Sequence, residues 1–305
     1  MDLAPIALFA YNRPDHLKGT VNSLLQNSIA SESELWIFSD APKNNEASIA
    51  VSEVRSFLKS VKGFKKIHII EREQNYGLGK NIIEGVTSVV SQYGKIIVLE
   101  DDLITSPYFL QFMNDGLTTY QNEPDVISVH GYLYPVTKKL PETFFVRGAD
   151  CLGWGTWKRA WELFEKDGAI LLDKIKKSGQ SHAFDFNGAY PYRRMLEDQV
   201  AGKNNSWAVR WYASAFINNK FTLYPGRSLV FHAGGDGSGV NTGFDEILNT
   251  KLSDRPIHVV PMRPAQNDLA VKEFGKVLAK LSNPPLIFRI RRKLKKLWNQ
   301  KSVKK

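Results

Sequence analysis

Residues 95–107 read Lys-Ile-Ile-Val-Leu-Glu-Asp-Asp-Leu-Ile-Thr-Ser-Pro, and this stretch decides how the rest of the sequence is interpreted. Its apolar run at 96–99 is rich in β-branched residues, which is typical of a strand buried on both faces of a parallel sheet. Glu100, Asp101 and Asp102 follow without a break. Three adjacent carboxylates at the end of a buried strand repel one another unless a cation or hydrogen-bond donors lie between them. The stretch therefore predicts a ligand site at the carboxyl edge of an open α/β sheet.

Two interpretations of the acidic triplet fit the residues alone. Carboxylate oxygens are hard ligands that suit Mg²⁺ or Mn²⁺, and these ions keep positions open for substrate phosphates. Alternatively, the triplet is a solvated acidic turn ahead of a helix that begins at Ser106-Pro107. The surrounding sequence favours the metal.

The length and composition suit a large globular protein. The chain has 305 residues, 43% of them hydrophobic, which is enough to bury a sizeable core in one large α/β domain or two smaller ones. Its single cysteine, Cys151, excludes an intramolecular disulfide framework and is interpreted as a small buried hydrophobe in a reducing compartment. The sequence shows neither a secretory signal pattern nor an apolar run long enough to cross a bilayer. We therefore expect a cytoplasmic protein.

Most of the net charge comes from the last segment. Residues 289–305 contain nine Lys or Arg and no acid, whereas the formal net charge of the whole chain is +10. Within 286–298, the Leu, Ile and Trp side chains fall roughly on one helical face, with cations opposite. This pattern is typical of a helix that lies in an anionic membrane interface. A solvated tail and a nucleic-acid contact are the alternatives, but no nucleic-acid recognition module accompanies the basic run.

Strand and helix patterns alternate along the first 130 residues. Such alternation is typical of a doubly wound, mostly parallel sheet, so the predicted fold class is α/β. Buried strands are expected at 4–10, 35–38, 66–71, 96–99 and 126–130, and amphipathic helices at 16–27, 51–61, 82–93 and 109–120.

The loops that follow these strands should meet at one edge of the sheet, near the acidic triplet. Backbone amides and one ammonium from the segment 77–80 could approach an anion there, although this segment lacks the P-loop spacing and the full dinucleotide fingerprint. A plain turn into a helix is the alternative for that segment. The residues expected at this edge are Tyr11, Arg13, Asp40, Asn75, Gly77, Gly79 and Lys80.

Residues 144–165 hold a cluster of tryptophans. Trp157, Trp161 and Phe164 have helical spacing and are expected in the core. Trp154 lies between two glycines, and an aromatic ring in a glycine-rich loop can lie flat under a sugar ring. We therefore expect Trp154 to contact a sugar.

A glycine-rich stretch follows the last predicted strand. Residues 231–239 contain four glycines together with His232 and Asp236. Because such a segment is not rigid without a partner, we expect a lid that orders over bound ligand. A disordered linker is the alternative.

Several of these motifs, taken together, resemble those of glycosyltransferases with the GT-A fold. The similarity is to bacterial family 2-type sugar transferases and, more distantly, to N-acetylglucosaminyltransferase I, and it covers most of residues 4–245. The acidic triplet followed at this distance by a Gly-Trp loop is fairly specific, whereas each motif alone is not. The motifs are Tyr11-Asn12-Arg13-Pro14, Ser39-Asp40, Asn75-Tyr76-Gly77-Leu78-Gly79, Glu100-Asp101-Asp102 and Leu152-Gly153-Trp154-Gly155-Thr156-Trp157.

The resemblance implies a nucleotide-diphosphate sugar donor, with a UDP-sugar favoured, and inversion at the anomeric carbon. It also implies a divalent metal, usually Mn²⁺ with Mg²⁺ as the alternative, held by Asp102 and His232. Such a metal stabilises the departing diphosphate as a Lewis acid, while the lid excludes water. The nucleotide-sugar-binding residues carried over by position are Tyr11, Asn12, Arg13, Asp40, Asn75, Gly79, Lys80, Glu100, Asp101 and Trp154.

Inversion also requires a carboxylate that accepts the proton of the acceptor hydroxyl. The family places this base in the second half of the chain, so Asp198 is the first candidate and Glu197 the second. Asp150, beside the Gly-Trp loop, is the third. The sequence departs from the family at 205–207, where simpler family 2 enzymes carry a Glu-Asp pair and this chain has Asn-Ser-Trp.

The resemblance and the tail together predict how the chain is organised. Residues 1–250 are expected to form the GT-A domain, with the nucleotide-sugar half at 1–130 and the acceptor half and lid at 131–250. Residues 251–283 are expected to be a peripheral strand and helix, and 284–305 a basic amphipathic tail. A tail at the inner face of a membrane suggests a lipid-linked or other glycan acceptor, as in the synthesis of lipopolysaccharide or another surface polysaccharide.

Three other classes of protein were weighed. A sugar-phosphate nucleotidylyltransferase should carry a glycine-rich, basic loop directly after its first strand, where this chain has Tyr-Asn-Arg-Pro. A receiver-type phosphoacceptor domain is far shorter, and its acid pair follows the first strand. A non-catalytic membrane-attached carbohydrate-binding scaffold has no need of the acidic triplet, Asp40 and a glycine-rich lid together.

Overall fold

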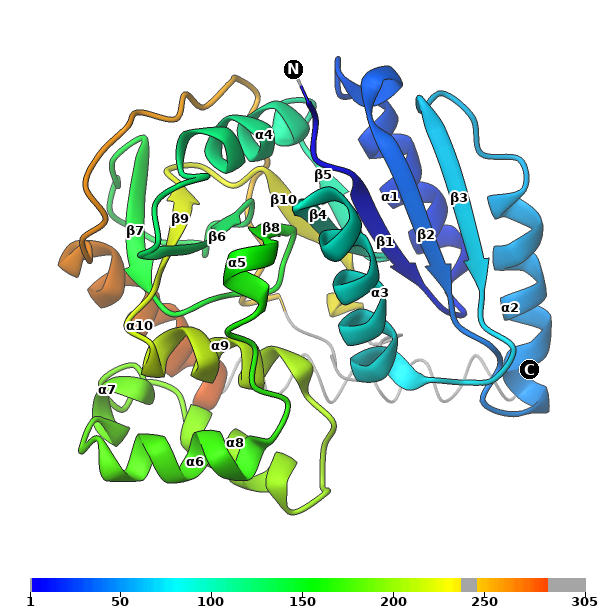
Figure 1. The fold of residues 1–305 in the computed structure, drawn as a ribbon. Helices are drawn as coiled ribbons and strands as arrows, with labels where there is room; N and C mark the ends of the chain where they lie inside the picture. The colour runs from blue at the N-terminus through cyan, green and yellow to red at the C-terminus, as the bar shows by residue number, and fades with distance from the viewer. Residues whose placement is uncertain (1, 237–245, 285–305) are drawn as a thin grey trace.

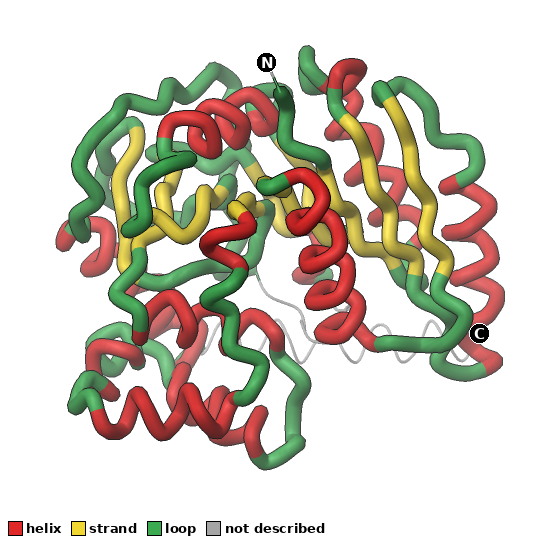
Figure 2. The backbone as a smooth tube through the Cα atoms, in the orientation of Figure 1, coloured by secondary structure: helices red, strands yellow, loops and turns green. Residues whose placement is uncertain are grey.

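The computed structural model describes residues 2–236 and 246–284, drawn as a ribbon in Figure 1 and as a tube in Figure 2. The strands are β1 (Ile6–Ala10), β2 (Glu34–Ser39), β3 (Lys66–Glu71), β4 (Lys95–Glu100), β5 (Leu103–Thr105), β6 (Val126–His130), β7 (Thr143–Arg147), β8 (Trp154–Trp157), β9 (Phe221–Pro225) and β10 (Val230–His232). The α-helices are α1 (Pro14–Leu25), α2 (Asn45–Leu58), α3 (Gly77–Tyr93), α4 (Phe109–Thr119), α5 (Lys158–Trp161), α6 (Gly168–Lys177), α7 (Ser181–Phe184), α8 (Tyr192–Val200), α9 (Trp207–Ile217) and α10 (Asp268–Ser282).

One mixed sheet organises the described part of the chain. Its eight strands follow the order β3-β2-β1-β4-β8-β6-β9-β7, and β8 and β7 run antiparallel to their neighbours while the remaining pairs are parallel. A second, two-stranded sheet pairs β10 antiparallel to β5. The predicted α/β class with a doubly wound, mostly parallel sheet is therefore confirmed.

The register of the central strands places the acidic triplet beside the first loop. Every residue of β1 is buried, and Phe9 of β1 lies opposite Glu100 of β4. Parallel strands in register end at the same edge of the sheet, which lies at the bottom of Figure 1 for β1 to β3. The turn after β1 and the acids after β4 are consequently neighbours.

Helix ends follow from capping groups in the sequence. The Asn44 side chain accepts a hydrogen bond from the Ala47 N–H at the start of α2, at 3.1 Å. Ser206 caps α9 in the same way through the Val209 N–H, at 3.2 Å. Helix α3 ends at Gly94, whose φ of 76° lies in the left-handed region that glycine adopts without strain.

Three expected boundaries were wrong. Helix α3 begins at Gly77 rather than near residue 82, so the predicted glycine loop forms the first helical turn. Residues 166–196, for which no element was predicted, contain α6, α7 and the start of α8. Trp157, expected at helical spacing, ends strand β8 and is buried there.

The C-terminal segment of the described chain is part of the body rather than an accessory. On α10, Phe274, Val277 and Leu278 are buried in the main hydrophobic core, so the expectation that 251–283 is peripheral was wrong. The predicted basic tail lies outside the described residues, apart from residue 284. Among the described helices, none combines the length and the apolar character needed to span a bilayer.

A buried histidine should make the fold sensitive to acid. His130 is fully buried, its Nδ1 lies 3.0 Å from the Tyr132 carbonyl oxygen, and its Nε2 accepts the Leu152 N–H at 3.0 Å. Only the neutral ring satisfies both contacts, and burial lowers the pKa of His130 below its ordinary 6.5. The unfolded chain therefore binds this proton more readily, so stability should fall as the pH drops below about 6.5.

We expect His130→Phe to lower the free energy of unfolding at pH 7.5 by about 1–3 kcal/mol, because the Leu152 N–H loses its acceptor. The variant should also lose part of the stability difference that urea titrations measure between pH 7.5 and 5.5. His258→Gln, at an exposed position, is the control. An unchanged pH difference in His130→Phe would assign the acid sensitivity to other groups.

Candidate active site

Arg13 lies across two carboxylates of the acidic triplet. Its guanidinium forms an ion pair with Asp101 and places Nη1 2.9 Å from Asp102 Oδ2. The Tyr11 N–H donates to Asp101 Oδ2 at 3.1 Å. These contacts join the turn after β1 to the end of β4, as the sequence predicted for Tyr11, Arg13 and the acids.

His232 brings a second strand to Asp102. Its Nε2 lies 3.4 Å from Asp102 Oδ2, and the Ala233 N–H donates to the Asp102 carbonyl oxygen at 2.8 Å. Gly234 leaves the space that this approach needs, because a Cβ there would lie 2.1 Å from Asp102 Oδ2 and 2.8 Å from His232 Nε2. Asp102 and His232, both predicted as metal ligands, therefore face one another over a glycine.

The three acids differ in their protonation. Burial, followed by the charges of Asp102 and Asp101, raises the pKa of Glu100 to about 8, so that this carboxyl group is mostly neutral at pH 7. Burial also raises the pKa of Asp101, although Arg13 opposes the effect. Burial acts the same way on Asp102, but contacts with His232 and Arg13 outweigh it and lower the pKa of Asp102. Asp102 is accordingly the acid best held as an anion.

One residue that holds this cluster was missed in the sequence. Thr20, on α1, is fully buried, and its hydroxyl donates to the Asp101 carbonyl oxygen at 2.7 Å. The signal was available, because Thr20 is a polar residue on the stripe formed by Leu17, Val21 and Leu24. A lone hydroxyl on an apolar helix face requires a partner in the core.

Asp40 holds the start of α3. Its Oδ1 accepts the N–H groups of Ala41 and Tyr76 at 2.9 and 2.8 Å, and its Oδ2 accepts the Gly77 N–H at 2.9 Å and the Asn75 amide at 3.2 Å. The two oxygens thus accept four hydrogen bonds, which fills the lone-pair positions of a carboxylate. The expectation that Asp40 contacts the nucleoside does not hold in this arrangement, because Asp40 and Asn75 bind each other and the backbone.

Cations surround Tyr76 beside this loop. Lys80 Nζ lies 3.9 Å from the centre of the Tyr76 ring, and the Arg72 guanidinium lies 4.6 Å from it. Lys80 also pairs with Glu84 at 3.8 Å. The structure therefore places Lys80 near the edge of the sheet as predicted and adds Arg72, which the sequence analysis did not single out.

The turn after β1 also reaches toward the Asp40 loop. The Tyr11 hydroxyl accepts the Lys43 N–H at 3.1 Å, while Asn12 lies half-buried between Tyr11 and Arg13. Tyr11 thus contacts Asp101 with its backbone and the segment after Asp40 with its side chain. The predicted site residues in the turn after β1 therefore lie beside those in the Asp40 loop.

The predicted sugar contact of Trp154 was wrong. Trp154 lies in β8, is fully buried, and has ring centres 5.5 to 5.8 Å from those of Trp207, Trp211 and Trp161. Rings on several sides leave no face for a sugar. The flanking glycines had indicated a loop, whereas Gly155 pairs within the sheet opposite Ile97.

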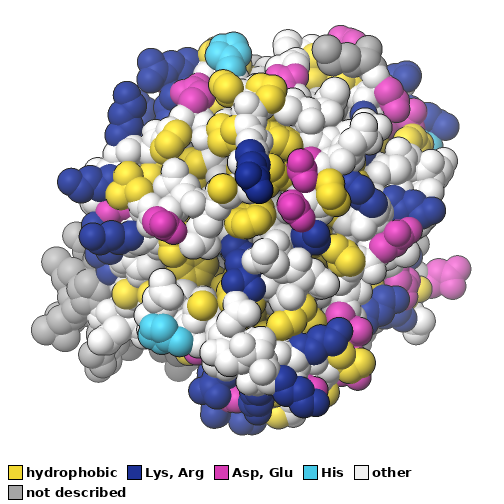
Figure 3. Space-filling model, turned by 60° about the vertical axis from the view of Figure 1, so that its left-hand side comes forward, with side chains coloured by type: hydrophobic (Ala, Val, Ile, Leu, Met, Phe, Trp, Pro, Cys, Tyr) yellow, Lys and Arg dark blue, Asp and Glu magenta, His cyan; other side chains and the backbone are white. Residues whose placement is uncertain are grey.

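The first two base candidates lie within a helical unit formed by α6, α7 and α8. Glu197 is 3.8 Å from both Lys176 and Arg193, and Asp198 is 3.4 Å from Arg194 and 3.3 Å from Lys203. Lys and Arg side chains gather at the lower end of the face in Figure 3, where this unit lies. Within residues 2–236 and 246–284, no ion pair joins Glu197 or Asp198 to the acidic triplet.

The departure from the family at 205–207 leaves a buried cation. Arg210 is 7% exposed and donates to the carbonyl oxygens of Ser206 and Lys166, and its Nη2 lies 3.4 Å from Asn205 Oδ1. Burial lowers the pKa of Arg210, and no carboxylate among the described residues pairs with it. The same loop packs on α3, since a Cβ on Gly79 would lie 2.8 Å from the Asn205 carbonyl oxygen. An amide therefore occupies the place where a carboxylate would neutralise Arg210.

The donor set at Asp102 fits a divalent cation that also binds a substrate. No group of three His, Cys, Asp or Glu side chains converges among the described residues, but Asp102 and His232 supply an oxygen and a nitrogen to one space. Two protein ligands leave several positions for phosphate oxygens and water, as is usual for Mg²⁺ and Mn²⁺ sites. The cleared position at Gly234 supports the same interpretation.

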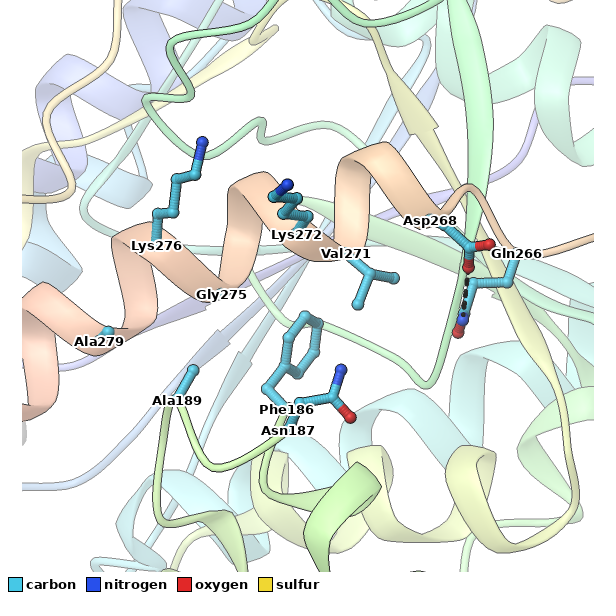
Figure 4. Close-up of a pocket in the computed structure, with 10 residues that line it drawn as sticks. All are labelled: Phe186, Asn187, Ala189, Gln266, Asp268, Val271, Lys272, Gly275, Lys276 and Ala279. Carbon is cyan, nitrogen blue, oxygen red and sulfur yellow. Dashed lines mark hydrogen bonds between the residues drawn. The ribbon is translucent and has the colours of Figure 1, made fainter.

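A hollow of about 600 Å³ lies elsewhere, between α10 and the turn before α8 (Figure 4). The Phe186 ring points toward α10 there, and Lys272 and Lys276 extend from the helix. None of its lining residues is a predicted site residue. Charge and hydrogen bonding, rather than the volume of a hollow, therefore locate the candidate site.

Comparisons with known proteins give a family and a partial structural likeness. The sequence model described as glycosyl transferase family 2 matches residues 6–181. The mannosyltransferase PcManGT of Pyrobaculum calidifontis, solved in complex with GDP-Man and Mn²⁺, is 12% identical over 42% of this chain and 37% of its own, with a TM-score of 0.30. TarS of S. aureus is 14% identical over 48% of this chain and 24% of its own, with a TM-score of 0.31. This chain therefore spans well under half the length of either solved chain, and no curated protein matches it.

Gly234→Ala should damage the site without unfolding the protein. The added Cβ overlaps Asp102 Oδ2, so the carboxylate and His232 must separate. We expect the affinity for UDP in the presence of Mn²⁺ to fall at least about tenfold, which is the usual effect when a metal ligand loses its orientation. Isothermal titration measures this affinity. Gly275→Ala is the control, because its Cβ would meet only the Ala189 Cβ at 3.7 Å. Equal affinity in both variants would show that the Asp102–His232 contact does not bind the ligand.

Proposed function

The chain belongs to glycosyl transferase family 2, and we propose that it transfers a sugar, with inversion, from a nucleotide-diphosphate donor to a glycan or lipid-linked acceptor. It is a glycosyltransferase with the α/β sheet of the GT-A fold. The observation that carries the proposal is the cluster of Arg13, Asp101, Asp102 and His232 at the carboxyl edge of that sheet.

Each residue of this cluster has a distinct part in donor binding. Arg13 neutralises the paired carboxylates and is positioned to face the diphosphate, because its guanidinium has donors beyond those used by Asp101 and Asp102. Asp101 fixes the turn at Tyr11 and so orients the nucleoside side of the site. Glu100, mostly neutral at pH 7, adds little repulsion to an anionic donor.

Asp102 and His232 are the residues that would hold Mn²⁺ or Mg²⁺. The metal supplies Lewis-acid stabilisation of the diphosphate as it departs. Asp102 is suited to this because its contacts keep it ionised, and Gly234 lets Asp102 and His232 approach one another. Residues 237–239 of the predicted lid lie outside the described residues, and its closure over the donor, which would limit hydrolysis by excluding water, stays a prediction.

The start of α3 forms the second wall of the donor site. Asp40 accepts the free N–H groups of this helix end, so its role is to fix the loop at Asn75 and Gly77 rather than to read the base. Tyr11, Asn12 and Lys80 stay the proposed contacts with the nucleoside and phosphates. A UDP-sugar is the favoured donor, as the sequence resemblance suggested.

The acceptor is proposed from the sequence of the tail. Nine cations without an acid at 289–305 favour an anionic membrane surface, which would bring the enzyme to lipid-linked acceptors of surface polysaccharide synthesis at the cytoplasmic face. Nucleic acid is not among the proposed partners.

Nucleotide titration tests the donor site. We expect one of UDP, GDP, dTDP and CMP to bind with a strong dependence on Mn²⁺, as measured by isothermal titration. Asp102→Asn should weaken this binding at least about tenfold, because the isosteric amide removes the ionised ligand while keeping its shape. Asp15→Asn is the matched control, since the Asp15 side chain is 93% exposed. Binding that is independent of both Mn²⁺ and Asp102 would contradict the proposed site, and no binding of any nucleotide would favour the non-catalytic scaffold.

Vesicle sedimentation tests the membrane contact. Replacing Arg289, Arg291, Arg292, Lys293 and Lys295 by Gln in the full chain removes five of the nine tail cations. At about 1 kcal/mol per cation near an anionic surface, the partition coefficient on phosphatidylserine-containing vesicles should fall by several orders of magnitude. Phosphatidylcholine vesicles are the control, and unchanged sedimentation of the variant with anionic vesicles would contradict the proposed role of the tail.

A further inference from the structure

Tyrosine side chains gather around the one base candidate that lies close to the donor site. The Tyr134 hydroxyl donates to Asp150 Oδ2 at 2.8 Å, and the Cys151 N–H donates to Oδ1 at 2.8 Å. Asp150 itself is half-buried, so its carboxylate has solvent-facing lone pairs left. Tyr192 and Tyr224 lie near enough for the charge of Asp150 to act on them. We call Asp150, Tyr134, Tyr192 and Tyr224 the Asp150 cluster.

The backbone after Asp150 packs against both strands that carry the donor site. A Cβ on Gly153 would lie 2.7 Å from Val230 Cγ2 and 3.6 Å from Leu99 Cδ2. Val230 precedes His232 by two residues, and Leu99 precedes Glu100 directly. Three residues of chain span at most about 10 Å, so Asp150 lies within about 10 Å of the place where Gly153 packs against Val230 and Leu99. The negative charges of Glu100 and Asp102 also contribute to raising the pKa of Cys151, after burial and Asp150, which agrees with this placement.

The first two base candidates have no comparable link to the donor site. Glu197 and Asp198 each have two cations within 4 Å, and those cations come from α6, α8 and the residues just after α8. These cations contact one oxygen of each carboxylate, Glu197 Oε1 and Asp198 Oδ1, and compete there with an acceptor hydroxyl. Asp150 binds a hydroxyl and an amide instead, which orient it and leave it open.

The tyrosines of the Asp150 cluster hold the carboxylate in place. Burial and the charge of Asp150 raise the pKa of Tyr134, Tyr192 and Tyr224, so the three phenols stay neutral at physiological pH. Their rings are fixed by aromatic neighbours, with Tyr192 4.6 Å from Tyr212 and Tyr224 5.3 Å from Phe274 between ring centres. Tyr134 and Tyr224 are only 8% and 4% exposed, so they form a rigid support for Asp150 rather than a surface for the acceptor.

We propose that Asp150 is the catalytic base of this enzyme, held in place by Tyr134 and the Cys151 N–H. The proposal rests on the sugar transfer proposed above. The acceptor hydroxyl gives its proton to the Asp150 carboxylate while its oxygen forms the bond to the anomeric carbon. The bond from that carbon to the donor diphosphate breaks, and its electron pair leaves with the nucleoside diphosphate. Tyr134 is a positioning residue, because its hydrogen bond fixes the Asp150 carboxylate.

Turnover with water as the acceptor tests the assignment without knowledge of the natural acceptor. The probes are UDP-glucose, UDP-N-acetylglucosamine and GDP-mannose, and the readout is release of nucleoside diphosphate. Asp150→Asn should lower kcat by about 10² to 10⁴, the usual contribution of a general base, while the Kd for the nucleotide stays within twofold. Asp150→Ala should lose activity equally and regain part of it with added formate, since formate replaces the missing carboxylate in the space created.

Two further variants separate catalysis from folding. Tyr134→Phe keeps the ring and removes one hydroxyl, so it should lower kcat less than Asp150→Asn and leave nucleotide affinity unchanged. Asp173→Asn, on the exposed side of α6, is the control for loss of a carboxylate.

The possible failures are distinguishable. Loss of turnover in Asp198→Asn with full activity in Asp150→Asn would overturn the assignment of Asp150 as the base. Equal losses of nucleotide affinity and turnover in Asp150→Asn would overturn it as well. Nucleotide binding by the wild type without turnover of any probe would overturn the role of Asp150 and leave the donor site standing. Absence of nucleotide binding would overturn the proposed function itself.

Discussion

Repulsion among Glu100, Asp101 and Asp102 is the constraint on which the rest of the site depends. The chain meets it in three ways: burial keeps Glu100 mostly neutral, Arg13 reaches across both aspartates, and His232 faces Asp102. The last two solutions tie the end of β4 to another element, namely the turn after β1 and strand β10. The geometry of the site is therefore the geometry required to hold like charges together. Removing any one partner alters the ionisation and the position of the remaining acids.

Much of the fold could be predicted from the sequence because the central strands are continuous apolar runs. β3 was predicted with its observed ends at Lys66 and Glu71, and the convergence of Tyr11 and Arg13 on the acids followed from the parallel order alone. The start of α3 could not be predicted, because Asp40, far away in sequence, supplies the carboxylate that accepts the N–H groups of its first turn. Local propensity alone favoured a glycine loop there, whereas the segment forms the first turn of α3.

The errors in the candidate site have a common physical origin in long-range packing. Trp154 has the local sequence of a loop, yet β4 and β6 pair with it on either side and α9, more than fifty residues later, covers its ring. The helical unit at α6 to α8 was missed because its helices are only four to ten residues long, which leaves few turns over which a helical period can be recognised.

The packing of Trp154 has a spectroscopic consequence. Four of the seven tryptophans, Trp154, Trp161, Trp207 and Trp211, form one cluster. Neighbouring ring centres in this cluster are 5.1 to 5.8 Å apart. Indoles at such separations exchange excitation energy, so their emission behaves as that of a single chromophore. This chromophore sits at the first turn of α9, directly after Asn205 and its contact with α3. The protein thus carries a built-in fluorescent reporter beside the contact between α9 and α3, and a change at this contact is readable in the unlabelled chain.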